Sequence, residues 1–123
     1  MARPKQRRQR QPAPDPHIFD LAHLRRYTQH NAELEAELLR LFNDQLSGLV
    51  KQIREGSVAG DWKLAVHTLK GSARAIGAPA IADLAARIED AGYSAPPETR
   101  ASLSDLVDQA IADFTKEAKK LAP

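Results

Sequence analysis

Hydrophobic residues recur every three to four positions along most of the chain, a spacing that predicts amphipathic helices. Such stripes predict a short helix over residues 17 to about 29 and longer helices over residues 32–55, 61–76 and 79 to about 92, with a last helix running to about residue 120. No segment shows the two-residue alternation that is typical of a half-buried strand. Because short connections make sequential helices antiparallel, we expect an all-α fold: an up-down four-helix bundle with a short extra N-terminal helix.

Two of the stripes carry specific information about packing. The last helix has the cleanest stripe, which consists of Leu103, Leu106, Val107, Ala110, Ile111, Phe114, Ala118 and Leu121. The stripe of the 32–55 helix contains an amide, Gln45, among Leu34, Leu38, Leu41, Phe42, Leu49 and Ile53. A glutamine in that place indicates either a position at the rim of the bundle or a hydrogen bond to another helix.

Capping residues indicate where several helices begin and end. Asn31 and Asp61 are good N-caps for the second and third helices, and Thr99 or Ser102 is expected to cap the last one. Gly77 tolerates the left-handed conformation that commonly ends a helix, so we expect the third helix to stop there.

Composition narrows the classes of protein to which the chain can belong. Its 123 residues suffice for one domain with a real core, and its 42% hydrophobic and 5% aromatic content suits helices. The absence of cysteine excludes disulfides and thiolate metal sites. No apolar run approaches the roughly 20 residues that span a bilayer, and the basic N-terminus lacks the apolar segment of a signal peptide. We therefore expect a cytoplasmic protein with no membrane partner.

Residues 1–16 differ from the rest of the chain in charge and in proline content. They hold five basic side chains, one acid and four prolines, so this segment is strongly positive within a chain of net charge +2. A segment of this kind cannot bury enough apolar surface to offset its ordering entropy. We predict a disordered basic tail over residues 1–16 and a folded domain over residues 17–123. A solubilising tail is the preferred interpretation, and binding of nucleic acid or an acidic partner is the alternative.

The helix predicted over residues 61–76 has a second face that the hydrophobic stripe does not explain. At about 100° per residue, this face carries Lys63, His67, Lys70, Gly71 and Arg74. A glycine inside a helix costs about 1 kcal/mol relative to alanine. The position of Gly71 beside the histidine indicates that something large must approach His67 closely.

The surroundings of His67 suit one kind of chemistry. Neighbouring cations disfavour the imidazolium and keep the ring in its neutral, nucleophilic form. The same cations attract an anion such as phosphate. A neutral, accessible imidazole with Lys70 three residues later is suited to accepting a phosphoryl group from a partner.

This part of the chain resembles a known family. The signature of histidine-containing phosphotransfer (HPt) domains of two-component phosphorelays is similar to HTLKGSA at residues 67–73, followed by IGA at residues 76–78. GDW at residues 60–62 and ELLRLF at residues 37–42 also match that family's pattern. The resemblance covers about residues 18–121 and implies a four-helix bundle with the histidine exposed midway along one helix.

The resemblance also implies a role for individual residues. His67 would be the phosphoacceptor, phosphorylated on Nε2, and Lys70 would bind the phosphoryl oxygens. Gly71 would give a partner clearance. Glu89, at the matching position of the following helix, would accept a hydrogen bond from Nδ1 of the histidine and orient the ring. The docking surface that the resemblance implies consists of the face with Lys63 and Arg74, the exposed side of the following helix and apolar residues of the first helix.

We therefore expect a phosphorelay intermediate rather than an enzyme. The sequence has no glycine-rich phosphate loop, no ATP-binding motif and no acidic cluster for Mg²⁺, so it needs no cofactor of its own. A response regulator receiver domain would supply the aspartyl phosphate and the Mg²⁺, and a sensor or hybrid histidine kinase would stand upstream. We expect a monomer that does not bind nucleic acid.

Four alternatives stay open at this point. The chain is also compatible with the phosphoacceptor domain of a chemotaxis-type histidine kinase, cut from a longer protein. A second alternative is a helical adaptor that transfers no phosphoryl group and in which His67 has lost its role. The presence of Lys70 and Gly71 argues against it. The bundle would be a mere scaffold if the basic tail bound nucleic acid. A metal site at His23 and His30 is the weakest alternative, because no further ligands cluster with them.

Overall fold

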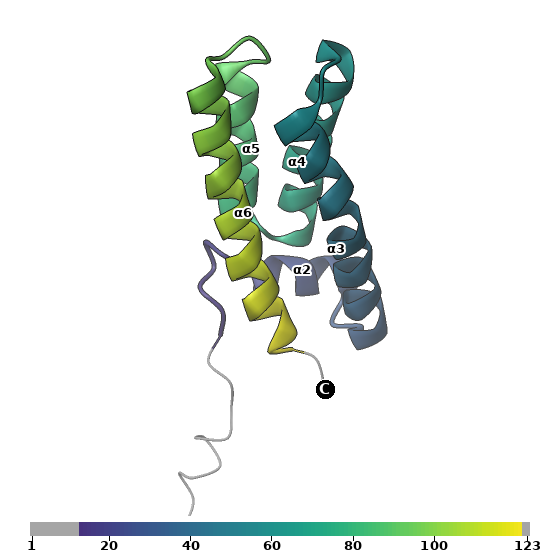
Figure 1. Ribbon diagram of the computed structural model, residues 1–123. Coiled ribbons are helices and arrows are strands. Elements are labelled where there is room, and N and C mark those ends of the chain that lie inside the picture. Colours follow the sequence, from purple (N-terminus) through teal and green to yellow (C-terminus); the bar gives the residue numbers. More distant parts are fainter. Residues whose placement is uncertain (1–12, 122–123) are drawn as a thin grey trace, which may run out of the picture.

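Four long helices stand side by side in the computed structural model, and a short one lies below the ends of the two middle helices (Figure 1). The structure describes residues 13–121. The elements are α2 (Leu21–Thr28), α3 (Ala32–Glu55), α4 (Ala59–Ile76), α5 (Pro79–Ala91) and α6 (Pro97–Lys119). No strand occurs among the described residues. The predicted all-α, up-down four-helix bundle with a short extra N-terminal helix is therefore confirmed.

The core lies between the four long helices and is centred on α4, which packs against α3 on one side and α5 on the other. The stripe predicted for this helix is buried, and its members are Trp62, Val66, Leu69, Ala73 and Ile76. α6 closes the bundle against α5 and α3. None of the described helices is long and apolar enough to cross a membrane.

Several predicted helix starts were wrong by a few residues. The short helix begins at Leu21 rather than at residue 17, because the Asp20 side chain caps it by accepting a hydrogen bond from the His23 amide (3.1 Å). Asp61 is not an N-cap: α4 begins two residues earlier, and Val58 occupies the cap without a side-chain bond. α3 and α5 have the predicted bounds within a residue, with Asn31 as the N-cap of α3.

The last helix also begins earlier than expected. Pro97 occupies its first turn, where the fixed φ of proline suits a helix and the missing N–H costs nothing. Thr99 and Ser102 consequently lie inside α6 and do not cap it. Within the predicted stripe of this helix, Leu106 is exposed instead of buried.

The segment before α2 anchors the N-terminal part of the domain to the turn between α4 and α5. Phe19 is completely buried, and its ring packs on Phe114 with 4.8 Å between centroids. The Asp20 amide donates to the Gly77 carbonyl (2.7 Å). Gly77 has φ +90°, and a Cβ there would lie 2.6 Å from the Asp20 carbonyl oxygen, so both its conformation and its neighbour require glycine.

The opposite end of the bundle is closed by a polar and aromatic cluster. The indole N–H of Trp62 donates to the carbonyl of Ile53 at the end of α3 (3.0 Å). The guanidinium of Arg100 lies over the rings of Trp62 and Tyr93, at 5.5 Å and 5.0 Å from their centroids. These contacts join α3, α4, α6 and the α5–α6 connection.

The predicted basic tail falls largely outside the described residues, which begin at residue 13. In the described part of that tail, the Asp15 carbonyl accepts hydrogen bonds from the amides of Ile18 and Phe19 (2.9 and 2.8 Å). This turn leads the chain into the anchored segment before α2.

Candidate functional site

His67 lies midway along α4, on the side of the helix opposite the buried stripe. Its side chain is 71% exposed. The ring therefore stands at the surface of the bundle, where a macromolecular partner can reach it.

Glu89 lies beside His67 because α4 and α5 pack closely. Ala82 and Ala85 on α5 are buried in the core, and these small side chains allow a close approach of the two helices. The Glu89 carboxylate places Oε2 at 3.4 Å from Nδ1 of His67. Since the two ring nitrogens lie on opposite edges of an imidazole, this contact leaves Nε2 on the edge away from Glu89.

Lys70 binds the same carboxylate from the other side. Its ammonium donates to Oε1 of Glu89, and its side chain is only 18% exposed. Lys70 and, to a smaller extent, His67 hold the pKa of the Glu89 carboxyl below its usual range. Glu89 is therefore ionised at neutral pH and bridges the ammonium and the imidazole.

Gly71 and the two remaining cations of this face lie at the surface. Gly71 is exposed, and a Cβ added to it would meet no atom within 4 Å. Internal packing thus gives no reason for the glycine. Lys63 and Arg74 are exposed on the same side of α4, and neither forms an ion pair within residues 13–121.

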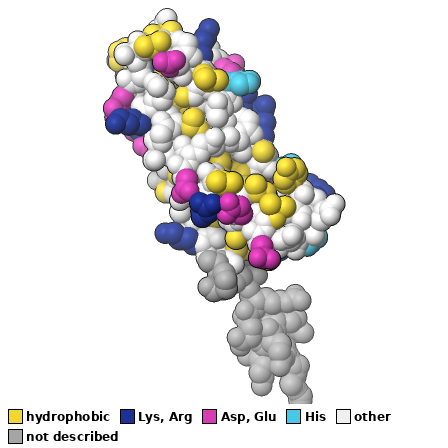
Figure 2. Space-filling model, turned by 90° about the vertical axis from the view of Figure 1, so that its right-hand side faces the viewer, with side chains coloured by type: hydrophobic (Ala, Val, Ile, Leu, Met, Phe, Trp, Pro, Cys, Tyr) yellow, Lys and Arg dark blue, Asp and Glu magenta, His cyan; other side chains and the backbone are white. Residues whose placement is uncertain are grey.

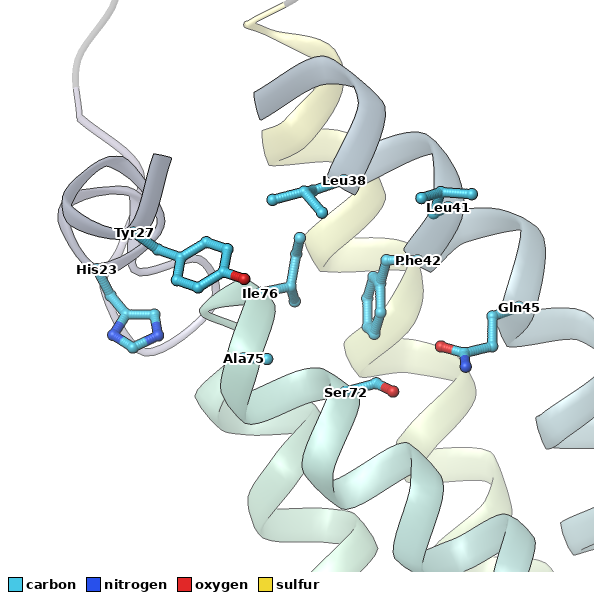
Figure 3. Close-up of a pocket in the computed structure, with 9 residues that line it drawn as sticks. All are labelled: His23, Tyr27, Leu38, Leu41, Phe42, Gln45, Ser72, Ala75 and Ile76. Atoms are coloured by element: carbon cyan, nitrogen blue, oxygen red, sulfur yellow. The ribbon is translucent and has the colours of Figure 1, made fainter. Parts of the chain in front are cut away.

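An apolar groove lies on the other flank of α4. It has a volume of about 620 Å³ and is formed by α2, α3 and α4 (Figure 3). We call it the α2 groove, and its lining consists of His23, Tyr27, Leu38, Leu41, Phe42, Gln45, Ser72, Ala75 and Ile76. Figure 2 shows hydrophobic side chains gathered on this side of the molecule, in the half where α2 lies.

Two members of the groove are large hydrophobic side chains that remain exposed. Tyr27 on α2 is 71% exposed and Leu41 on α3 is 49% exposed, although the predicted stripe placed Leu41 in the core. Gln45 is exposed as well and lines the groove, so the rim interpretation of this amide is confirmed. Leu46, which the stripe omitted, is buried in its place.

Within the described residues, no group of three or more histidines and acids could hold a metal ion. His23 belongs to the α2 groove, and His30 lies exposed in the α2–α3 connection with φ 61°.

The comparisons identify the family. The sequence model of the Hpt domain matches residues 36–113, which is more than half of the chain. No curated protein and no solved structure matches significantly. The chain therefore belongs to the Hpt domain family, whose members are helical bundles that carry out histidine phosphotransfer in phosphorelays together with receiver domains and histidine kinases.

The match covers some parts of the site and omits others. It includes His67, Lys70, Gly71 and Glu89, together with most of α3. α2 precedes it, so one wall of the α2 groove lies outside the region that the family model describes.

Proposed function

We propose that this protein is a phosphorelay intermediate and that His67 is its phosphoacceptor. The observation that carries the proposal is the geometry of the imidazole: an exposed ring whose Nδ1 faces the ionised Glu89, so that Nε2 is free to react. A carboxylate on Nδ1 favours the tautomer with the proton on that nitrogen and the lone pair on Nε2.

The reaction balances without a cofactor held by this chain. Nε2 of His67 attacks the phosphorus of an aspartyl phosphate on a receiver domain, the N–P bond forms, and the P–O bond to the aspartate breaks. The receiver keeps its free carboxylate and the Mg²⁺ that neutralises the phosphoryl oxygens. The ring becomes cationic with its proton on Nδ1, and Glu89 stabilises that charge. Transfer to the aspartate of a second receiver is the same step in reverse.

The other residues of the face support the transfer in different ways. Lys70 neutralises Glu89 in the unphosphorylated protein and is proposed to bind the phosphoryl oxygens once they are on the ring. Gly71 provides clearance for the docking receiver. The free cations Lys63 and Arg74 attract the phosphorylated, negatively charged partner and belong to the docking surface. A carrier of this kind acts as a monomer in the cytoplasm, where it meets its receivers and its sensor or hybrid kinase.

The test is a transfer assay with a purified receiver domain that carries labelled aspartyl phosphate. We expect the wild type to acquire acid-labile, alkali-stable label and the His67→Gln variant to acquire none. His30→Gln is the matched control, because His30 is an exposed histidine away from α4 and its replacement should leave labelling unchanged. Equal labelling of the wild type and His67→Gln would overturn the proposal.

The same assay separates the alternative functions. If the chain is the phosphoacceptor domain of a chemotaxis-type kinase, a kinase catalytic domain with ATP labels His67 far faster than any phosphorylated receiver does. If it is an adaptor, neither donor labels it.

A further inference from the structure

We propose that the N-terminal end of this protein binds an acidic protein segment, at a site separate from His67. The basic residues 1–12 attract the segment through its charge, and a cavity that begins at residue 13 holds one of its apolar side chains. This end of the chain precedes residue 36, where the match to the family model begins.

The cavity lies between the segment before α2 and α2 itself. We call it the N-terminal cavity, and its volume is about 430 Å³. Most of its lining is apolar and comes from Pro14, Pro16, Phe19, Leu21 and Ala22. Phe19 is completely buried against Phe114 of α6, so this wall is fixed to the core before a ligand arrives. Such a preformed apolar cavity fits an apolar side chain.

Two arginines line the same cavity, Arg25 and Arg26. Nε of Arg25 donates to Oε1 of Glu35 (2.9 Å), whose side chain is only 11% exposed. Arg25 forms no other side-chain hydrogen bond within residues 13–121, so its two terminal nitrogens are held in place for a carboxylate of the ligand. Asp20 is the one acid among the described lining residues, and it already accepts a hydrogen bond from the His23 amide.

The distribution of charge directs an acidic partner to this end of the molecule. Residues 1–12, which lie outside the described residues, hold five of the 18 basic side chains and none of the 16 acidic ones. The rest of the chain therefore has more acids than bases. The basic segment is a poor occupant of the cavity beside it, because Arg25 and Arg26 repel it.

Two other classes of anionic partner fit the N-terminal cavity less well. Single-stranded nucleic acid binds where its bases can stack on aromatic side chains. Among the described lining residues, Phe19 is the only aromatic, and it is completely buried. A lipid surface requires a helix with a free apolar face, but Leu24 of α2 is completely buried in the bundle.

A segment bound in this cavity leaves His67 accessible. The Asp20 amide donates to the carbonyl of Gly77 at the end of α4. His67 precedes Gly77 by ten residues, about 15 Å along the helix axis. The acidic segment can therefore hold this protein close to the molecule that carries the segment, at a raised local concentration, while other partners use the histidine.

Synthetic peptides and the whole 123-residue chain provide the experiment. One fluorescent peptide has a leucine flanked by six glutamates, and the other has a glycine in place of the leucine. In anisotropy titrations, we expect the leucine peptide to bind about fivefold more tightly, as partial burial of one leucine predicts. Combined replacement of Arg7, Arg8 and Arg10 by glutamine should weaken both peptides about tenfold and reduce the salt dependence, with their ratio unchanged.

Ala22→Glu tests the cavity, and Ala101→Glu is its matched control. Both alanines are exposed near the N-terminus of a helix, where an added acid is favourable, but only Ala22 lines the cavity. Ala22→Glu should weaken the leucine peptide about tenfold and remove the preference for leucine. Ala101→Glu adds the same charge and should keep the wild-type ratio. Circular dichroism melting curves must show that both variants are folded.

Four outcomes would overturn the inference. Equal affinities of the wild type for the two peptides would show that the cavity is not used. Tighter binding of a single-stranded oligonucleotide of equal charge, or of vesicles that contain phosphatidylserine, would assign this end to nucleic acid or to a membrane. A wild-type dimer that Ala22→Glu dissociates would assign the cavity to a second copy of the chain. Inhibition of His67 labelling by saturating peptide would place the peptide at the histidine. Because peptide binding does not require labelling of His67, failure of either proposal is recognisable without the other.

Discussion

The two flanks of His67 differ in almost every physical property, although one helix presents both. On the α5 flank, three polar side chains share a single contact network: the carboxylate of Glu89 binds Lys70 through one oxygen and faces Nδ1 of His67 with the other. On the α3 flank, the surface is apolar and open, and Tyr27 of α2 remains largely exposed. The difference shows that one helix can present an ion-paired polar flank and an open apolar flank on the two sides of one imidazole.

A side chain at Gly71 should disturb both flanks at once and have the largest effect. Gly71→Gln places an amide in the open space next to His67, and the helix should tolerate it because the position is exposed and glutamine is a better helix former. Misplacing a reacting group by about 1 Å costs about 100-fold in rate, so we expect a loss of this size in receiver transfer. Single-turnover kinetics measures it.

Gly71→Ala provides the graded comparison. Its smaller side chain should slow transfer far less than the glutamine does. A normal rate in Gly71→Gln would remove partner clearance as the explanation for the glycine.

Loosening α2 should destabilise the apolar flank, because the Gly77–Asp20 contact anchors this helix, and should leave the Lys70–Glu89 pair on the polar flank in place. In Gly77→Ala, the new Cβ meets the Asp20 carbonyl and the residue keeps an unfavourable positive φ, so we expect a loss of about 2 kcal/mol in the free energy of unfolding. Chemical denaturation measures it.

Gly48→Ala is the control for that substitution. Gly48 lies within α3, and a Cβ there would meet no atom within 4 Å, so this variant should be at least as stable as the wild type. If Gly77→Ala unfolds at the same denaturant concentration as the wild type, the close contact does not fix α2.

Removing the carboxylate should affect the polar flank alone. In Glu89→Ala, the ring loses its orienting group and the positive charge that develops on it loses a stabilising contact. A hydrogen bond to a charged group contributes about 1.5 kcal/mol or more, so transfer should slow about tenfold without being abolished. The Kd for the receiver should stay within about twofold, because this variant keeps the docking cations Lys63 and Arg74.

The Kd and the transfer rate can be measured separately if a catalytically inactive receiver is used for the Kd. Binding is measured by titration and transfer by rapid quench with the active receiver. A weaker Kd at an unchanged rate in Glu89→Ala would assign Glu89 to docking instead of to the transfer step.

The smallest expected effect is a dependence of stability on pH. Lys70 and His67 lower the pKa of Glu89 in the folded protein, so its ionised form is stabilised by folding. That contribution is complete above the unfolded pKa, about 4.3, and is lost as the pH falls through the lower folded value. Because Glu89 is 37% exposed, we expect less than about 1 kcal/mol. The difference in unfolding free energy between the wild type and Glu89→Gln should therefore shrink as the pH falls below the unfolded pKa and vanish once the pH lies below the folded one.

Periodicity and capping predicted most of the fold because they act within single helices. Asn31 caps α3 as expected, and Gly77 ends α4. The start of α4 was wrong because Asp61 has the chemistry of a cap, but the helix continues for two residues before it, where the Trp62 amide bonds to the Val58 carbonyl. The start of α6 was wrong because Pro97 initiates a helix as effectively as a capping side chain does.

The two flanks of the candidate site were not equally predictable. The polar flank was predictable because the family signature placed Glu89 on the helix that follows the one with His67. The packing of these two helices then brings the carboxylate close to the ring. The α2 groove depends on the direction in which α2 crosses the bundle, which is fixed by contacts between distant segments: Phe19 with Phe114, and Asp20 with Gly77. Phe19 is a single aromatic residue before a short helix, so no hydrophobic periodicity indicates that it is buried. Gln45 was the one local signal, since an amide within an apolar stripe marked the rim.

The cluster around Trp62 gives the protein a built-in optical probe. Trp62 is the single tryptophan of the chain, and its indole is 1% exposed, hydrogen-bonded to the Ile53 carbonyl and covered by Arg100. It lies on the buried face of α4, on the side of the helix away from His67. Its fluorescence should therefore shift to longer wavelength on unfolding and stay constant when a tryptophan-free receiver docks. One emission spectrum can then distinguish a variant that is unfolded from one that is folded but no longer binds its partner.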